Sequence, residues 1–252
     1  MCGRYLIVSS PEAVRALFCY PELPNFPARY NVAPTQPIPI VRIWQGQRQF
    51  TLVRWGLLPP WVKDPRSFTL LINARAGTVL DKPSFRAPML RRRCLIPADG
   101  FYEWKADGAR KRPHVILPAA GGPVAFAGVW EVWIGPNGEE LETAAIITTE
   151  ASRTLHHIHH RMPVVIPPHA FDEWLDCANV DAKAAAALLV PAPEDFFTAY
   201  EISTAVNRVA NDSPELLAPA TADTGADAVT EPATKRQKPV RAKDDSQQGS
   251  LF

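Results

Sequence analysis

Residues 124–148 read VAFAGVWEVWIGPNGEELETAAIIT, and this stretch decides the fold class. Two runs dominated by apolar residues, 124–134 and 141–148, flank Pro136-Asn137-Gly138, which has the composition of a tight turn. The pattern predicts two long antiparallel strands joined as a β-hairpin.

Further strand-like segments and turn sequences surround this hairpin. They are 37–44 and 49–57 around Gln45-Gly46-Gln47, then 94–97 and 100–105 before Asp107-Gly108, then 114–117, and 162–166 before Pro167-Pro168. Helices are expected at 11–18, with Ser10 as N-cap and Pro11 at the first helical position, and at 169–176 and 181–189. Because hairpins follow in series and strands dominate, we expect an α+β fold. Its core is a mainly antiparallel β-sheet curled into an open barrel, with short helices at the periphery.

The chain has 252 residues, of which 46% are hydrophobic, and this suits one large domain with a tail. Residues 1–217 are expected to fold as one unit. From residue 218 onward large apolar residues are rare until the end, so the tail 218–252 is expected to be disordered. No feature of the sequence demands more than a monomer.

Composition also indicates the cellular compartment and limits the kinds of binding partner. No apolar run reaches about 18 residues and no signal peptide is visible, so a membrane protein is not expected. The four cysteines contain no CxxC pair, which favours free thiols in a reducing, cytoplasmic compartment. The net charge of +1 disfavours a protein that coats duplex DNA without specificity, although it leaves room for a local basic cleft.

Cysteine follows the initiator methionine in Met1-Cys2-Gly3-Arg4. If Met1 is removed, Cys2 carries an α-amine and a thiol two bonds apart, a pair that no internal cysteine offers. Such a 1,2-aminothiol condenses with an aldehyde through a Schiff base, and the tethered thiol then closes a five-membered thiazolidine. This chemistry requires no cofactor and no metal. The alternative is a small second residue without any chemical role.

Three further segments carry candidate site residues. Asn73 and Arg75 follow the apolar run 70–72, where a strand exit could aim an amide and a guanidinium into a cleft. Glu103 lies among aromatic residues in GFYEW, and an apolar setting raises the pKa of a carboxyl and suits it to proton transfer. Their alternatives are a turn asparagine with a solvated arginine, and an exposed glutamate on an edge strand.

The segment 156–160 holds four of the six histidines, and one of them could serve in acid–base chemistry. A metal site is the alternative, although no HExxH motif or cysteine pair accompanies the cluster. Trp55 and Trp61 lie on a proline-rich loop and are expected either to stack on unpaired bases or to belong to the core. Arg91-Arg92-Arg93 reads as a solvated face or a phosphate track.

Taken together, these pieces resemble the SRAP family of SOS-response-associated peptidases, or abasic-site processing proteins. The matching segments are MCGRY at 1–5, YNVAPTQ at 30–36, WGLLPPW at 55–61, NARA at 73–76, RRCLIPADGFYEW at 92–104, TTEA at 148–151, IHHRMPVVI at 158–166 and STAVNRVANDSPELL at 203–217. The resemblance implies a sensor of abasic sites in single-stranded DNA. On this resemblance, Cys2 would form a thiazolidine crosslink with the sugar aldehyde and so protect the lesion during replication and repair.

The resemblance also implies residue roles. Asn73 would position Cys2, Glu103 would act as acid and base, and His159 would assist ring opening and Schiff-base exchange. The DNA-binding residues would be Arg4, Arg75, Trp55 and Trp61. Two positions depart from the family pattern, since Gly77 replaces a frequent Glu and His160 stands where Asp or Glu is usual.

Other functions stay open on the sequence alone. Cys2 could be the N-terminal nucleophile of a peptidase that removes Met1 itself, alongside lyase-type Schiff-base chemistry. The histidine cluster could form a metal-binding module. The chain ends Gln248-Gly249-Ser250-Leu251-Phe252, in which Gln248, Leu251 and Phe252 resemble the peptide that docks on bacterial sliding clamps. A DNA substrate would place the cytoplasmic protein at the nucleoid.

Overall fold

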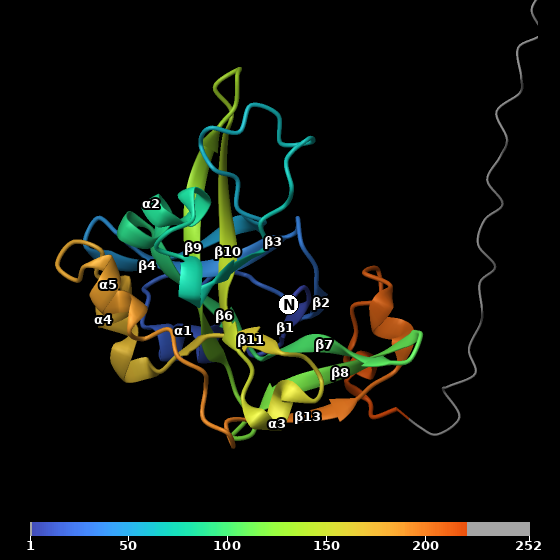
Figure 1. Ribbon diagram of the computed structural model, residues 1–252. Coiled ribbons are helices and arrows are strands. Elements are labelled where there is room, and N and C mark those ends of the chain that lie inside the picture. The colour runs from blue at the N-terminus through green and yellow to red at the C-terminus, as the bar shows by residue number, and fades with distance from the viewer. Residues whose placement is uncertain (1, 221–252) are drawn as a thin grey trace, which may run out of the picture. The chain divides into compact units, whose positions relative to one another are not determined.

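The computed structural model of the protein describes residues 2–220 (Figure 1). The expected disorder from residue 221 onward and the clamp-like residues Gln248, Leu251 and Phe252 lie outside the described residues. The described chain stays attached to the fold past the expected boundary at residue 217, because the Ala220 amide donates to the Glu201 carbonyl at 2.9 Å.

Five strands form the first sheet, in the order β13-β8-β7-β1-β2. They are β1 (Tyr5–Ile7), β2 (Arg29–Val32), β7 (Gly100–Asp107), β8 (Arg110–Pro118) and β13 (Phe197–Glu201). All of their pairings are antiparallel. Gly100 is required where β7 passes β8, since a Cβ there would lie 2.5 Å from the Ile116 carbonyl oxygen.

Eight strands form the second sheet. They are β3 (Pro37–Trp44), β4 (Gln47–Trp55), β5 (Asn73–Arg75), β6 (Arg93–Ala98), β9 (Val124–Ile134), β10 (Glu140–Glu150), β11 (Arg161–Pro163) and β12 (Val165–Ile166). Within it, β3 pairs with β4, β4 with β10, β10 with β9, β9 with β6, and β6 back with β3. The α+β class is confirmed, and these pairings close a ring where an open barrel was expected. Two pairings are parallel, those of β10 with β4 and with β5.

Local turn chemistry explains the hairpins. The β3–β4 turn is the pair Gln45-Gly46, whose φ angles of 51° and 78° are both positive, as the favoured two-residue hairpin turn requires. The expected β9–β10 hairpin is confirmed. Its strands pair from Ile134↔Glu140 to Gly128↔Ile146.

Short helices surround the sheets. They are α1 (Pro11–Phe18), α2 (Pro83–Arg91), α3 (Arg153–His156), α4 (Phe171–Leu175) and α5 (Ala182–Ala186), with 3-10 turns at Ala76–Thr78, Pro168–Ala170, Thr204–Asn207 and Pro214–Leu217. The expected N-cap of α1 is confirmed, because the Ser10 hydroxyl accepts from the Ala13 amide at 3.2 Å. Among residues 2–220 no helix combines the length and the apolar character needed to cross a membrane.

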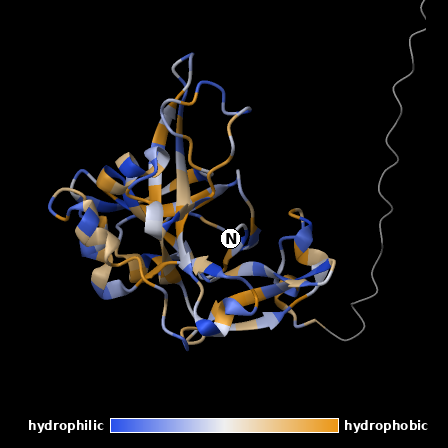
Figure 2. Ribbon diagram, in the orientation of Figure 1, coloured by the Kyte–Doolittle hydropathy of each residue, from blue (hydrophilic) through white to orange (hydrophobic). Residues whose placement is uncertain are grey.

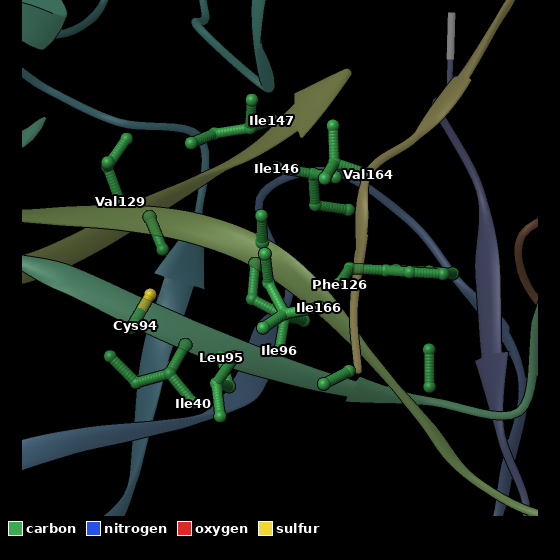
Figure 3. Close-up of a cluster of buried hydrophobic side chains, with 14 of the residues drawn as sticks. Ile40, Cys94, Leu95, Ile96, Phe126, Val129, Ile146, Ile147, Val164 and Ile166 are labelled. Carbon is green, nitrogen blue, oxygen red and sulfur yellow. The ribbon is translucent and has the colours of Figure 1, made fainter. Parts of the chain in front are cut away.

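The main core lies inside and around the ring of strands. Figure 3 shows part of it, in which Ile40 of β3, Leu95 and Ile96 of β6, Phe126 of β9 and Ile146 of β10 meet. Figure 2 shows apolar and polar residues interspersed along the strands and helices, as expected for elements that bury one face.

The segment after β13 is clasped to β2 by two side chains. The buried Asn31 donates from Nδ2 to the carbonyls of Val206, Arg208 and Asn211, at 3.2, 3.1 and 2.7 Å. In return, Asp212 accepts from the Asn31 amide at 3.0 Å and pairs with Arg29 at 2.6 Å. This clasp joins segments about 180 residues apart in the chain.

Candidate active site around Cys2

Cys2 lies just ahead of β1 and is fully buried. Its carbonyl oxygen accepts a hydrogen bond from Nδ2 of Asn73 at 2.9 Å, and its thiol lies 3.9 Å from the Arg4 carbonyl oxygen. Burial raises the pKa of the Cys2 thiol well above its ordinary value, and the negative charge of Glu103 raises it further. The thiol of the resting protein is therefore protonated.

Asn73 reaches Cys2 because β5 is held in the second sheet. β5 pairs in parallel with β10, in the register Ile146↔Asn73 to Thr148↔Arg75. Ala74 between them is buried, and Asn73 and Arg75 share the opposite face. Asn73 and Arg75 thus lie within a strand, and not at the exit of one as expected. The structure thereby brings the Asn73 side chain to the Cys2 backbone.

Glu103 lies on β7 opposite His114 of β8 and is only 4% exposed, so it is not an exposed edge-strand glutamate. Burial raises the pKa of its carboxyl. Since its charge also acts on the Cys2 thiol, the carboxyl and the thiol share one electrostatic environment. A carboxyl of this kind can hold a proton at a higher pH than an ordinary glutamate and exchange it nearby.

His159 lies beside Glu103, with 3.9 Å between its Nδ1 and Oε1 of the carboxyl. The same Nδ1 lies 3.0 Å from the Arg161 amide nitrogen and 3.2 Å from the Arg161 carbonyl oxygen. Burial lowers the pKa of His159 and so favours its neutral form. The ring of His160 stacks on it, with centroids 4.4 Å apart.

The alternative of a metal centre in the histidine segment finds no support in the geometry. Within residues 2–220 no three or more His, Cys, Asp or Glu side chains are grouped in a way that could hold a metal ion. His159 is engaged with Glu103 and with the backbone of Arg161, as a proton-transfer group would be.

Arg4 is committed mainly to the fold. Its Nη1 donates to Oδ1 of Asn31 at 2.7 Å and to the Val206 carbonyl at 2.8 Å, and its guanidinium lies 5.8 Å from the ring centroid of Trp104. The side chain is partly exposed. Any contact of Arg4 with a phosphate would therefore share the guanidinium with this internal network.

Arg75 is exposed, and a second arginine that sequence analysis did not single out stands beside it. Arg161 donates from Nε to Oγ1 of Thr148 at 3.1 Å, and Thr148 lies opposite Arg75 in the β5–β10 pairing. Burial and then the charge of Arg75 lower the pKa of Arg161, so the two cations repel one another. An anion such as a phosphate would relieve that repulsion. The signal was present in the sequence, since Arg161 belongs to the RMP motif.

The two tryptophans of the 55–61 loop differ in their exposure to solvent. Trp55 is 0% exposed and its indole N–H donates to the Ile72 carbonyl at 3.0 Å, so it belongs to the core. Trp61 is 55% exposed. The expectation that Trp55 faces DNA is therefore corrected, because a ring without an exposed face cannot stack on a base, and Trp61 is the candidate for stacking.

The three arginines at 91–93 also differ in their exposure, since Arg91 is exposed and Arg93 is buried. Arg93 is almost fully buried and donates to four carbonyls, those of Met89, Trp174, Asp176 and Val180. It ties β6 to α4 and to the segment ahead of α5. Arg93 is thus neither part of a solvated face nor part of a phosphate track.

The chain is similar to known proteins over most of its length. A family model described as SOS response associated peptidase (SRAP) matches residues 1–209. The chain is 41% identical over 222 residues to the abasic site processing protein YoqW of Bacillus subtilis, which covers 86% of this chain and 99% of that protein. It is 38% identical over 198 residues to the abasic site processing protein HMCES of Gallus gallus, covering 69% of this chain and 58% of that protein.

The fold is shared with solved structures. An X-ray crystal structure of a protein from Bacteroides thetaiotaomicron superposes with a TM-score of 0.77 at 28% identity. The match covers 87% of this chain and 100% of that one.

Proposed function

Because the chain belongs to the SOS response associated peptidase (SRAP) family, we propose that it processes abasic sites in single-stranded DNA by forming a covalent thiazolidine with its N-terminal Cys2. The observation that carries the proposal is the hydrogen bond that holds Cys2 on Asn73, with a Glu103–His159 pair whose buried carboxyl acts by its charge on the thiol. Asn73 holds the Cys2 carbonyl, Glu103 acts electrostatically on the thiol, and His159 lies beside Glu103.

The reaction follows from an aminothiol meeting an aldehyde. With Met1 removed, the Cys2 amine attacks C1′ of the ring-opened sugar, and the resulting carbinolamine loses water to give an imine. The thiol then adds to the imine carbon. The S–C bond forms, the π electrons of the C=N bond go to nitrogen, which takes up a proton, and the sulfur gives its proton to a base. The second step is intramolecular and so needs no further encounter.

Glu103 is suited to both proton transfers. Because burial raises its pKa, the carboxyl can be protonated when water must leave the carbinolamine, and the resulting carboxylate can then take the thiol proton. The neutral ring of His159, which burial favours, carries one N–H proton. That proton is available to the ring oxygen as the sugar opens.

The surroundings suit a DNA strand that lacks one base. Arg75 and Arg161 provide adjacent cations for the phosphates, and Trp61 provides an exposed ring for a neighbouring base. Cys2 is enclosed. A sugar without a base is the smallest nucleotide unit that can bring an aldehyde to it, which favours an abasic site over an intact nucleotide.

Intact mass spectrometry after incubation with a single-stranded abasic oligonucleotide tests the proposal. The parent should lose Met1 and gain one oligonucleotide in a bond that survives denaturation. Cys2→Ala should give no such adduct. Cys2→Ser keeps the amine and loses the thiol, so it should give only an imine that requires borohydride to be trapped. Cys19→Ala, which alters an exposed cysteine, is the matched control and should behave as the parent. A normal yield of stable adduct from Cys2→Ala would exclude the mechanism.

Peptidase action on the chain's own start is a second candidate, favoured by the thiol that shares its surroundings with Glu103 and His159. The Cys2 thiol would then cleave the Met1–Cys2 bond itself. Cell-free synthesis without a methionine aminopeptidase distinguishes the two routes to Cys2. Loss of Met1 from the parent and its retention in Glu103→Gln support self-cleavage, and retention in both excludes it.

A further inference from the structure

The hairpin formed by β7 and β8 carries a group of positive charges that the chemistry described above does not use. Its outer half, residues 105–112, contains four basic side chains and one acidic side chain. The whole chain has a net charge of only +1, so this part of the hairpin is a local basic surface on a nearly neutral protein. A local excess of positive charge favours an anionic partner.

The outer half of the hairpin extends beyond the rest of its sheet. On one side β1 pairs with β7 at Gly100 and Phe101, and on the other side β13 pairs with β8 as far out as His114. Beyond these positions the two strands continue to pair with each other as far as Asp107↔Arg110. Residues 106–112 are all exposed, and Figure 1 shows this ribbon extending away from the N-terminus. The ribbon is therefore accessible to a ligand.

Three of the four basic side chains on this ribbon lack an ion pair. Arg112 is held by two carboxylates, since it pairs with Glu201 and lies 3.5 Å from Asp107. The other three make no ion pair within residues 2–220, and they are Lys105, Arg110 and Lys111. Lys105 lies directly opposite Arg112 in the strand pairing, and like charges in that position destabilise a hairpin. The three cations therefore do not serve to hold the hairpin together.

The row of cations begins next to the candidate acid–base residue. Glu103 and Lys105 lie on the same face of β7, two residues and about 7 Å apart. Arg110 lies four positions further out along the strand pairing than Glu103, at about 14 Å. Burial is the main cause that lowers the pKa of His159, and the positive charge of Lys111 contributes to the same shift. The charges of the hairpin thus extend outward from the site itself.

We propose that the outer half of the β7–β8 hairpin binds the phosphates of single-stranded DNA on one side of the abasic site. The contacts come from Lys105, Arg110 and Lys111. This inference rests on the proposed function, which brings the lesion to Cys2. Because the hairpin extends from the site in one direction, it meets the nucleotides on one side of the lesion only. Arg75 and Arg161 lie on strands of the second sheet, so the DNA meets cations from both sheets.

Three variants separate charge from structure. The test variant carries Lys105→Gln, Arg110→Gln and Lys111→Gln. The matched control removes three exposed cations on and next to α2 and α5, which lie away from the hairpin in Figure 1, and it carries Lys82→Gln, Arg86→Gln and Lys183→Gln. The charge-preserving variant carries Lys105→Arg, Arg110→Lys and Lys111→Arg. All three should unfold at the parent's temperature, because the changed side chains have no ion pair to lose.

Binding to an intact single-stranded oligonucleotide is measured by fluorescence anisotropy over a range of salt concentrations. Each phosphate contact contributes about 0.7 to the slope of log affinity against log salt for a single strand, so the test variant should lose about 2 from the slope. Its affinity should fall by about 10- to 100-fold near 0.1 M salt, and the difference should vanish toward 1 M. The matched control and the charge-preserving variant should follow the parent.

Abasic oligonucleotides that extend in only one direction from the lesion test the polarity of binding. At low DNA concentration the test variant should form the adduct more slowly than the parent for one direction, 5′ or 3′, and at the parent's rate for the other. At saturating DNA the rates should be equal, since the hairpin binds DNA and takes no part in the chemistry.

Four results would overturn the inference: an unchanged salt slope in the test variant, an equal loss in the matched control, an equal loss for both directions, or slower adduct formation that persists at saturating DNA. The intact oligonucleotide keeps the binding test independent of the proposed reaction. A parent that binds it through the hairpin but never forms an adduct with an abasic strand refutes the thiazolidine function alone.

Discussion

Replacing Glu103 by glutamine tests whether this residue acts in proton transfer or only in folding. The change keeps the shape of a side chain that is 4% exposed and removes its ability to exchange a proton. General acid–base catalysis contributes about 10²–10⁴-fold, so formation of the stable adduct should slow by that factor. Because Glu103 is buried and is not one of the cations proposed to meet the phosphates, noncovalent affinity for single-stranded DNA should change by less than about threefold.

Stability supplies the second readout, and its sign follows from the pKa. Burial raises the pKa of Glu103 in the folded protein, so the carboxyl contributes its stability below the unfolded-state pKa and loses it as the pH rises through the folded-state value. Glutamine has no such loss. Glu103→Gln should therefore be at least as stable as the parent near neutral pH, and the difference should shrink as the pH falls below the ordinary glutamate range.

Quenched-flow sampling gives the adduct rate, fluorescence anisotropy gives the DNA affinity, and urea unfolding at two pH values gives stability. Glu140→Gln is the matched control, because Glu140 is an exposed glutamate at the start of β10. The reasoning fails if Glu103→Gln loses most of its DNA affinity or unfolds well below the parent at neutral pH. Either result would make Glu103 a structural group.

Three further outcomes are expected. Arg93→Ala should lower the free energy of unfolding in urea by about 3–5 kcal/mol, because four buried carbonyls lose a charged donor, whereas Arg91→Ala should change it by less than about 0.5 kcal/mol; similar small values for both would contradict the buried network. Trp61→Ala should cost about 1–3 kcal/mol of affinity for single-stranded DNA in anisotropy titrations and leave stability intact. Trp55→Ala should instead cost about 3–5 kcal/mol of stability, and the reverse pattern would return Trp55 to the DNA surface. Deleting residues 248–252 should abolish binding to a bacterial sliding clamp in surface plasmon resonance while crosslinking continues, and unchanged clamp affinity would remove that role.

The hairpins could be predicted from the sequence because their determinants are local. Two positive φ angles at Gln45-Gly46 and a turn-forming Pro136-Asn137-Gly138 each specify a reversal within a few residues. The same holds for α1, whose cap and first proline are adjacent in the sequence.

Pairings between distant segments could not be predicted in this way. The ring closes through a single β3–β6 pair, Val41↔Leu95, and through the parallel contact of β4 with β10, neither of which leaves a local pattern. Helix α2 was missed because Pro88 lies inside it, where proline normally breaks a helix. The three-residue strand β5 is too short to show a period and exists because β10 pairs with it.

The candidate site was predicted mainly from resemblance. Cys2 followed from its own chemistry, whereas the placement of Asn73 beside it depends on the β5–β10 pairing. The prediction that Trp55 faces DNA was wrong, because nearby prolines do not determine whether a tryptophan ring points into the core or toward solvent.

The clasp between Asn31 and the chain around Asp212 bears on how a recombinant fragment should be cut. The match of the family model ends at residue 209, yet two of the groups that secure Asn31 and Arg29, the Asn211 carbonyl and the Asp212 carboxylate, come after that point. A fragment that ends at residue 209 would leave the buried side-chain amide of Asn31 without the Asn211 carbonyl. Asn31 and the nearby Val206 carbonyl also hold Arg4, two residues after Cys2. The fragment to express or transplant is therefore longer than residues 1–209, and a shortened version would be judged inactive for a reason unrelated to its chemistry.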